Sequence, residues 1–325
     1  MNRTSVFSGS EFLGKTLFTY RWVNFQVQSN EIIHPPSNNI SVRPLKVHAE
    51  GFFVSHPRQK LRFQLPKLEG ALKVIQENHE PLHLLYHSLI QQASAYSYEV
   101  TSRSFEEHVR LSCELSRGKD AVSMPIFTFD DGHVSNYECA IPILSRFGIS
   151  SIFFVTVNWI GTPKYLTWQQ VRTMQSLGHE IGSHTLSHPM LTHCGDSELE
   201  KEILNSKRLL ENRLGAPTRS ISFPGGRYNR RVLEACQKAG YGRIYTSDPY
   251  SFSIGGVPLL GRTAVHNYMD LVYMRDLITN NKLLLFKMSA LFATKQFAKR
   301  LLGDRLYWKL WRLKTHCQLE SPFGE

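Results

Sequence analysis

The chain of 325 residues contains few cysteines and no long apolar run, and both absences restrict its class. Its five cysteines are an odd number without paired spacing, which disfavours a disulfide framework and favours a reducing compartment. No stretch approaches the ~18 uninterrupted apolar residues of a membrane-spanning helix. Residues 1–11 lack the continuous apolar segment of a secretory signal. We therefore expect a cytoplasmic protein, which could still lie against the inner face of the membrane.

Acidic residues are fewer than basic ones, 27 against 38, which gives a formal net charge of +11. This excess favours acidic partners. Nucleic acid is not expected among them, because we find no groove-reading motif and no aromatic stacking platform. With 42% hydrophobic and 20% charged residues, the composition is that of an ordinary globular protein.

The most informative segment is residues 126–133, where an apolar, strand-like run ends in Asp130, Asp131 and Gly132. Adjacent strand residues point to opposite faces. A turn at Gly132 could nevertheless aim both carboxylates into one cavity, where one binds a metal and the other accepts a proton. The alternative is a capped turn, in which an aspartate satisfies the first amides of the next helix.

A second segment carries His184 and His188, four residues apart after a short apolar run. On a helical turn, positions i and i+4 share a face. Two imidazoles and one carboxylate from elsewhere would form a three-ligand site with a position open for water, as catalytic zinc requires. Two histidines with this spacing are, by themselves, more often ordinary surface or core residues than metal ligands. Its place one strand and helix after the aspartates favours the metal site.

These segments together resemble the polysaccharide deacetylase family, also called the NodB-homology or carbohydrate esterase family 4 domain. Residues 128–132 match its first motif, residues 184–188 its second, and residues 222–229 a divergent form of its third. The resemblance covers roughly residues 81–277. It implies a deformed (β/α) barrel that removes N-acetyl groups from glycans.

The resemblance also implies roles for five residues. Asp130 would be the general base, and the backbone N–H of Gly225 would hold the oxyanion. One divalent metal would have three ligands, which are Asp131, His184 and His188. Zinc is preferred, with cobalt or nickel as alternatives. The chemistry agrees, because a divalent metal polarises an amide carbonyl and makes bound water more acidic.

The third motif departs from the family pattern. Many members carry an arginine two residues before the proline, where it orients the base, but this chain has Ser222. Arg227 or Arg262 could supply the missing charge, although a surface position is the more common one for each. Because Ser222 stands in place of this arginine, the alternative is a carbohydrate-binding protein without catalytic activity.

The general acid is a second departure, because the late histidine motif of many members has no good match. His266 is the nearest candidate there. Residues 82–89, however, resemble the first strand of circularly permuted members related to biofilm-polysaccharide deacetylases, whose acid histidine lies on that strand. We therefore favour a permuted member with His87 as the acid. The alternative for His87 is a strand-end histidine that only forms hydrogen bonds.

From residue 81 the chain alternates strands and helices, which predicts a parallel sheet closed into an open (β/α) barrel with the motifs at strand carboxyl ends. The predicted strands are Leu82–Tyr86, Met124–Phe129, Ser151–Val155, Glu180–Ser183, Ser220–Phe223 and Arg243–Thr246. Helices are expected over residues 197–214 and 230–240. The catalytic domain is predicted to span residues 81–280.

The flanking segments differ from this domain. Residues 1–80 alternate apolar and polar positions at 25–28 and 63–65, which predicts a β-rich extension of short antiparallel strands. Residues 281–325 form a predicted amphipathic helical tail with basic residues and tryptophans, typical of contact with an anionic membrane. The alternative is a helix docked on the barrel with a basic solvated face.

We therefore expect a metal-dependent hydrolase that deacetylates an amino sugar of a surface polysaccharide or of its lipid-linked precursor. A deamidase or a cyclic amide hydrolase, acting on other non-peptide C–N bonds, is the alternative enzyme. A long glycan needs a groove lined by exposed aromatic residues, whereas a closed pocket would favour the alternative. The candidates for such a lining are Trp159, Tyr165, Trp168 and Tyr250.

Overall fold

The computed structural model describes residues 8–13, 16–21, 53–56, 59–62, 81–119, 121–254 and 257–285, with isolated positions from 287 to 310. The chain divides into two compact units, residues 1–72 and 73–325. In the described part of the chain, no helix is long and apolar enough to cross a membrane.

The first unit contains a four-stranded antiparallel sheet in the order β1-β2-β3-β4. Its strands are β1 (Ser8–Leu13), β2 (Thr16–Arg21), β3 (Phe53–His56) and β4 (Gln59–Arg62). The described part of the N-terminal extension is therefore β-structure. The segments predicted to alternate, 25–28 and 63–65, lie outside the described residues.

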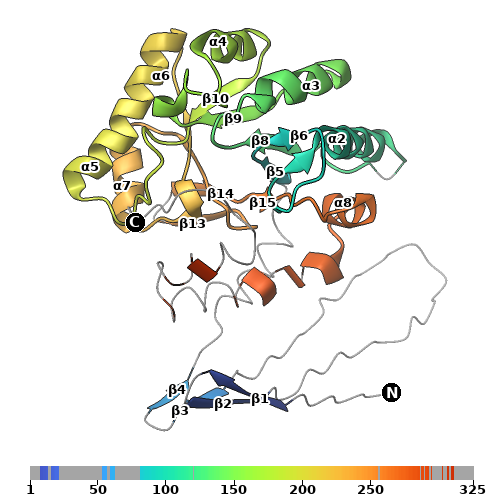
Figure 1. The fold of residues 1–325 in the computed structure, drawn as a ribbon, viewed down its shortest axis with the longest axis vertical. Coiled ribbons are helices and arrows are strands. Elements are labelled where there is room, and N and C mark those ends of the chain that lie inside the picture. The colour runs from blue at the N-terminus through green and yellow to red at the C-terminus, as the bar shows by residue number, and fades with distance from the viewer. Residues whose placement is uncertain are drawn as a thin grey trace, which may run out of the picture. The chain divides into compact units, whose positions relative to one another are not determined.

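The second unit is built on a nine-stranded sheet in the order β13-β14-β12-β11-β10-β9-β8-β5-β15 (Figure 1). The strands are β5 (His83–Tyr86), β8 (Ile126–Phe129), β9 (Ile152–Val155), β10 (Glu180–Ser183), β11 (Ser220–Ser222), β12 (Arg243–Tyr245), β13 (Phe252–Ile254), β14 (Val257–Leu260) and β15 (Thr263–Ala264). Eight of them run parallel, and β13 is antiparallel to its neighbour β14. A separate two-stranded sheet pairs β6 (Leu89–Ile90) with β7 (Val100–Thr101).

Helices connect the strands and cover the outside of the curved sheet (Figure 1). They are α2 (Ser102–Arg117), α3 (Ile141–Phe147), α4 (Trp168–Ser176), α5 (Asp196–Glu200), α6 (Ser206–Leu214), α7 (Arg230–Lys238) and α8 (Leu271–Ile278). Two π-helical segments, η1 (Asn136–Ala140) and η3 (Lys201–Asn205), lead directly into α3 and α6. Two short 3₁₀ turns are η2 (Val157–Trp159) and η4 (Pro224–Gly226).

The link between β14 and β15 shows why the sheet must curl. Leu260 ends β14 and Thr263 begins β15, so their Cα atoms lie within ~10–11 Å of each other. The two strands nevertheless stand at opposite ends of the eight parallel strands. The linker includes Gly261, where a Cβ atom would approach the carbonyl carbon of Tyr250 to 2.2 Å. The predicted deformed (β/α) barrel is confirmed.

Buried aromatic side chains fill the space between the sheet and the helices. Phe129 on β8 stacks on Phe153 on β9 with ring centroids 4.8 Å apart, and both are fully buried. Each such side chain contributes about 1.5–3 kcal/mol through removal from water. On β10, a Cβ at Gly182 would lie 2.5 Å from the Phe154 ring, so only glycine fits there. Packing therefore fixes the strands whose ends carry the motifs.

All six predicted strands are present, with bounds that differ by at most two residues. The parallel strands β14 and β15 were not predicted, because they are short and interrupted by glycine and proline. The predicted tail falls mostly outside the described residues. Its boundary at 280/281 and the domain boundary at 80/81 stay predictions.

Candidate active site

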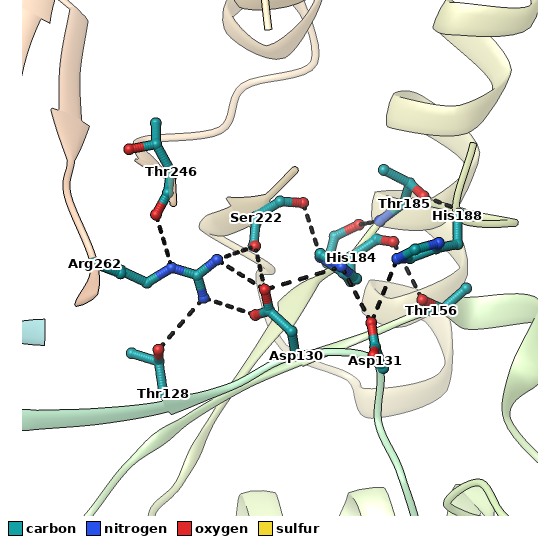
Figure 2. A network of polar contacts seen from close by, with 11 residues as sticks. Thr128, Asp130, Asp131, Thr156, His184, Thr185, His188, Ser222, Thr246 and Arg262 are labelled. Atoms are coloured by element: carbon teal, nitrogen blue, oxygen red, sulfur yellow. Dashed lines mark hydrogen bonds and ion pairs between the residues drawn. The ribbon is translucent and has the colours of Figure 1, made fainter. Parts of the chain in front are cut away.

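Three potential metal ligands meet at the carboxyl ends of β8 and β10 (Figure 2). The Nε2 atoms of His184 and His188 each lie 3.4 Å from Oδ1 of Asp131. This distance is long for an N–H···O hydrogen bond. It suits two ligands of one tetrahedral ion, which lie ~3.3–3.6 Å apart when each is about 2.0–2.2 Å from zinc. The three side chains therefore fit a divalent metal.

Hydrogen bonding orients the first histidine for this role. Nδ1 of His184 lies 3.1 Å from the carbonyl oxygen of Ser222, to which it can donate. A proton on Nδ1 would leave the lone pair of Nε2 for a metal ion shared with Asp131. Burial lowers the pKa of the His184 imidazole, but the charges of Asp130 and Asp131 outweigh burial and raise it.

The Asp131 carboxyl is ionised in this setting. Burial raises its pKa, but the polar contacts of His184 and His188 outweigh that effect and hold the pKa well below the usual range. A carboxylate without its proton is the form that binds metal.

The predicted helical turn between the two histidines is wrong. Residues 184–188 form a loop in which Thr185 and His188 both have a φ of +69°. The loop closes through the His188 N–H, which donates to the Thr185 hydroxyl at 3.0 Å. A left-handed turn thus brings the imidazoles together in place of helical periodicity. Asp131 is also left-handed, with φ +73°, so conformations that cost about 1–3 kcal/mol each gather at this site.

The turn predicted after the aspartates is present at Gly132, where φ is +80°. A Cβ at this position would lie 3.1 Å from Cγ1 of Val155. The turn lets Asp130 and Asp131 face the same region. The Asp130 carboxylate binds an arginine and a serine, so the capped-turn alternative does not describe it.

Arg262 is the cationic partner of Asp130. Its Nη1 donates to Oδ1 of Asp130 at 2.7 Å and its Nη2 to Oδ2 at 2.8 Å. Nη2 also donates to the Ser222 hydroxyl at 2.6 Å, and that hydroxyl donates to Asp130 at 3.1 Å. The expectation that Arg262 lies on the surface is wrong, because its side chain is fully buried. Arg227 is half-buried on the turn after Gly226.

This pairing controls the charge of the candidate base. Burial raises the pKa of the Asp130 carboxyl, but Arg262 and His184 outweigh burial and lower it below its ordinary value. Asp130 is therefore a carboxylate at neutral pH, 4.0 Å from Nε2 of His184. Ser222 stands at the sequence position where many family members have an arginine. In the folded chain, Arg262 supplies the positive charge beside Asp130.

His87 follows β5 and lies within electrostatic range of the aspartates. Burial lowers the pKa of its imidazole, and the charges of Asp131 and Asp130 only partly oppose this. Its Nδ1 is buried without a hydrogen-bond partner among the described residues. Its ring stands edge-on to Tyr98 at 5.2 Å, and His266 contacts the same tyrosine ring at 4.4 Å. The two acid candidates therefore flank one side chain.

Gly225 lies in η4, the turn that follows β11. Its φ is +60°, and a Cβ would approach Cε of Met190 to 2.7 Å. The positive φ therefore favours glycine at the position predicted to hold the oxyanion.

Two of the four predicted groove aromatics border the metal site. The Trp159 ring lies 4.8 Å from that of His188 and 4.7 Å from that of Tyr165. Burial and the charge of Asp131 raise the pKa of the Tyr165 hydroxyl. Trp168 instead contacts Arg213, and the Tyr250 hydroxyl donates to the carbonyl oxygen of Leu285.

Two buried supporting residues were not predicted. The Asn136 side chain donates to the His87 carbonyl oxygen at 2.8 Å, and Glu202 accepts hydrogen bonds from the loop that carries the metal ligands. One sequence signal could have identified Glu202. It is a charged residue at an apolar position of its helix, next to Ile203.

Comparisons with known proteins agree with this geometry. The polysaccharide deacetylase family model matches residues 117–244. A Bacillus subtilis protein assigned to the polysaccharide deacetylases is 32% identical over 181 residues, which cover 51% of this chain and 64% of that protein. The peptidoglycan-N-acetylglucosamine deacetylase of Bacillus cereus is 30% identical over 155 residues, 46% of this chain and 70% of that enzyme.

Among solved structures, the Streptococcus pyogenes deacetylase PplD, in complex with acetate, has a similar fold. The TM-score is 0.54 at 22% identity, over 61% of this chain and 97% of that one. The chain belongs to the polysaccharide deacetylase family, which confirms the predicted resemblance. It spans less than two thirds of the Bacillus subtilis relative. Circular permutation stays a prediction.

Replacing Arg262 with Met should lower the free energy of unfolding by about 3–5 kcal/mol, because the buried Asp130 carboxylate loses its counter-charge. Adding Asp130→Asn should recover part of this loss, since a neutral amide needs no counter-charge. The measurement is urea unfolding of metal-free protein for the four members of the double-mutant cycle.

The matched control for this cycle is Arg243→Met. The ion pair of Arg243 with Glu180 is partly exposed, with 44% and 27% of the two side chains accessible. Such a pair contributes ~0–1 kcal/mol. Strictly additive effects of Arg262→Met and Asp130→Asn would contradict a coupled buried pair.

Proposed function

We propose that this chain is a metal-dependent N-deacetylase acting on an amino sugar of a surface polysaccharide or of its lipid-linked precursor. The observation that carries the proposal is the convergence of the ligand atoms of Asp131, His184 and His188 beside an ionised Asp130. The relative that deacetylates peptidoglycan N-acetylglucosamine supports an N-acetylated glycan as substrate. We propose zinc as the metal, with cobalt or nickel as alternatives.

A bound divalent ion would polarise the acetamide carbonyl and make water more acidic. Asp130 takes the proton of the attacking water, and Arg262 keeps this carboxylate oriented between turnovers. The Gly225 N–H donates to the developing oxyanion. His87 donates a proton to the amine nitrogen as the C–N bond breaks, so that the products are the free amino sugar and acetate.

The two alternative functions differ in their support. A non-catalytic carbohydrate-binding protein was favoured by Ser222, but Arg262 now occupies the electrostatic role that Ser222 left empty. A deamidase or cyclic amide hydrolase would use the same ligands. The half-buried Trp159 and Tyr165 beside His188 favour a sugar ring over a small cyclic amide.

The test is metal analysis of purified protein combined with acetate release from chitin oligomers and from cell-derived glycan. Asp130→Asn should retain the metal and lose acetate release by a factor on the order of 100 or more, the usual value of a positioned base. His188→Ala is the matched comparison and should lose both metal and activity. Metal loss in Asp130→Asn would reassign Asp130 as a ligand, and near-wild-type turnover would end its role as the base.

His87 and His266 can be separated by single substitutions to alanine. We expect His87→Ala to reduce acetate release by about 100-fold with unchanged metal content, because a positioned acid contributes that much. His266→Ala should remain close to wild type. An inactive His266→Ala beside an active His87→Ala would assign the acid to the late loop and remove the argument for a permuted site.

We also propose that residues 281–325 bind an anionic membrane surface from the cytoplasmic side. Their sequence interleaves basic residues with Trp308 and Trp311, as interfacial helices do. A lipid-linked precursor would be presented at that surface.

Truncation before Lys295 should therefore abolish sedimentation with anionic vesicles and leave turnover of soluble oligomers intact. Salt should weaken the binding of the full chain, because the attraction is screened. An unfolded truncation would instead support a helix docked on the barrel.

A further inference from the structure

The loop that joins the two candidate histidine ligands needs support from outside itself. Thr185 and His188 both occupy the left-handed region, which side chains other than glycine rarely adopt. The loop also sets the position of His188 relative to Asp131, because β10 ends at Ser183. Without external contacts, such a loop would relax to other conformations and separate the ligand atoms.

A single buried carboxylate supplies these contacts. Oε2 of Glu202 accepts the N–H groups of Leu186 and Ser187, both at 2.9 Å. Its Oε1 accepts the Ser187 hydroxyl at 2.5 Å. All three donors lie between His184 and His188 in the sequence. Hydrogen bonds to an ionised acceptor are about twice as strong as neutral ones, and Glu202 is only 6% exposed.

The fold places Glu202 through a π-helical segment. Glu202 lies in η3, between α5 and α6, and π segments insert a residue into a helix and often occur at functional sites. Leu199 and Ile203 on either side of it are buried in one apolar cluster, so the segment cannot move freely. The carboxylate is therefore presented to the loop by a fixed element.

The same helix also holds the start of the loop. The Ser183 hydroxyl donates to the Ser206 hydroxyl at 2.9 Å and accepts the Thr185 N–H at 3.1 Å. Ser183 and Ser206 are both fully buried. Contacts from one helical segment thus reach the residue before His184 and the two residues before His188.

We propose that Glu202 is a positioning residue for the metal site: it fixes the loop so that His184 and His188 present Nε2 toward Asp131 before the metal binds. The inference rests on the proposed metal-dependent function and adds a requirement to it. Glu202 acts through the backbone, since its carboxylate is engaged by Leu186 and Ser187. Outer contacts of this kind change metal affinity by about 10–100-fold when they are removed.

Glu202→Gln tests the proposal with little change of size. In the glutamine side chain only the carbonyl oxygen accepts hydrogen bonds. The NH₂ group would therefore face an N–H or O–H donor of the loop, and at least one hydrogen bond would be lost. We expect zinc to bind about 10–100-fold more weakly to the metal-free variant, measured by competition with a chromophoric chelator. Circular dichroism and thermal unfolding of the metal-free protein report separately whether the variant is folded.

Glu211→Gln is the matched control. Glu211 lies on α6, accepts the Thr218 N–H at 3.0 Å and pairs with Lys207 at 2.8 Å, and among the described residues neither of these partners belongs to the loop. Its zinc affinity should equal that of the wild type. Ser187→Ala is the second test variant: it removes one donor to Glu202, and we expect zinc affinity to fall by less than in Glu202→Gln.

A folded Glu202→Gln that binds zinc as tightly as the wild type would overturn the inference, even if its thermal stability is lower. If Glu202→Gln does not fold, Ser187→Ala decides: weaker zinc binding supports the inference and unchanged binding overturns it. A wild type that binds neither zinc, cobalt nor nickel would overturn the proposed function itself. The two failures are therefore distinguishable.

Discussion

Arg262 carries a permanent charge with no exposed side-chain surface, and such a group is tolerated only when an anion and hydrogen-bond acceptors surround it. Its five donor groups reach the carboxylate of Asp130, the hydroxyls of Ser222 and Thr128 and the carbonyl oxygen of Thr246. Asp130 and Thr246 follow β8 and β12, and Ser222 is the last residue of β11. The rings of Phe154 and Tyr245 add cation–π contacts at 5.1 and 6.0 Å. The guanidinium therefore ties β8 to β11 and β12, neither of which is a neighbour of β8 in the sheet.

Arg262 also lies at the point where the barrel closes. It lies in the two-residue link between β14 and β15, the strands at opposite ends of the parallel sheet. Curling the sheet brings this link over the strand ends that carry Asp130 and Ser222. The same geometry that closes the fold thus delivers the counter-charge of the candidate base. His83 on β5 does not compete for the carboxylate, because burial and Arg262 lower its pKa to about 4 and keep it neutral.

The two adjacent aspartates acquire different roles from different partners. Asp130 meets a fixed guanidinium, which keeps it ionised and oriented. Asp131, on the left-handed turn before Gly132, meets two imidazoles whose Nε2 atoms converge on one of its oxygens. Paired carboxylates in contrasting environments are a common basis for dividing acid, base and ligand functions. Backbone strain at Asp131 and His188 is the cost of directing both groups to one point.

Local features of this protein could be predicted from short windows of its sequence. The Asp-Asp-Gly turn, the histidine pair and the alternation of strands with helices lie within short windows, and they predicted the family, the barrel and the three ligand positions that the structure brings together. The contacts between distant residues became visible only in the folded chain. Arg262 lies 132 residues after Asp130, and no periodicity in the sequence distinguishes it from a surface arginine. The spacing of His184 and His188 predicted a helical turn, but the two residues lie in a loop. This loop depends on hydrogen bonds to Glu202, which belongs to a later helix. Charge pairing and hydrogen bonding between distant residues arise only when the sheet closes, so local pattern cannot specify them.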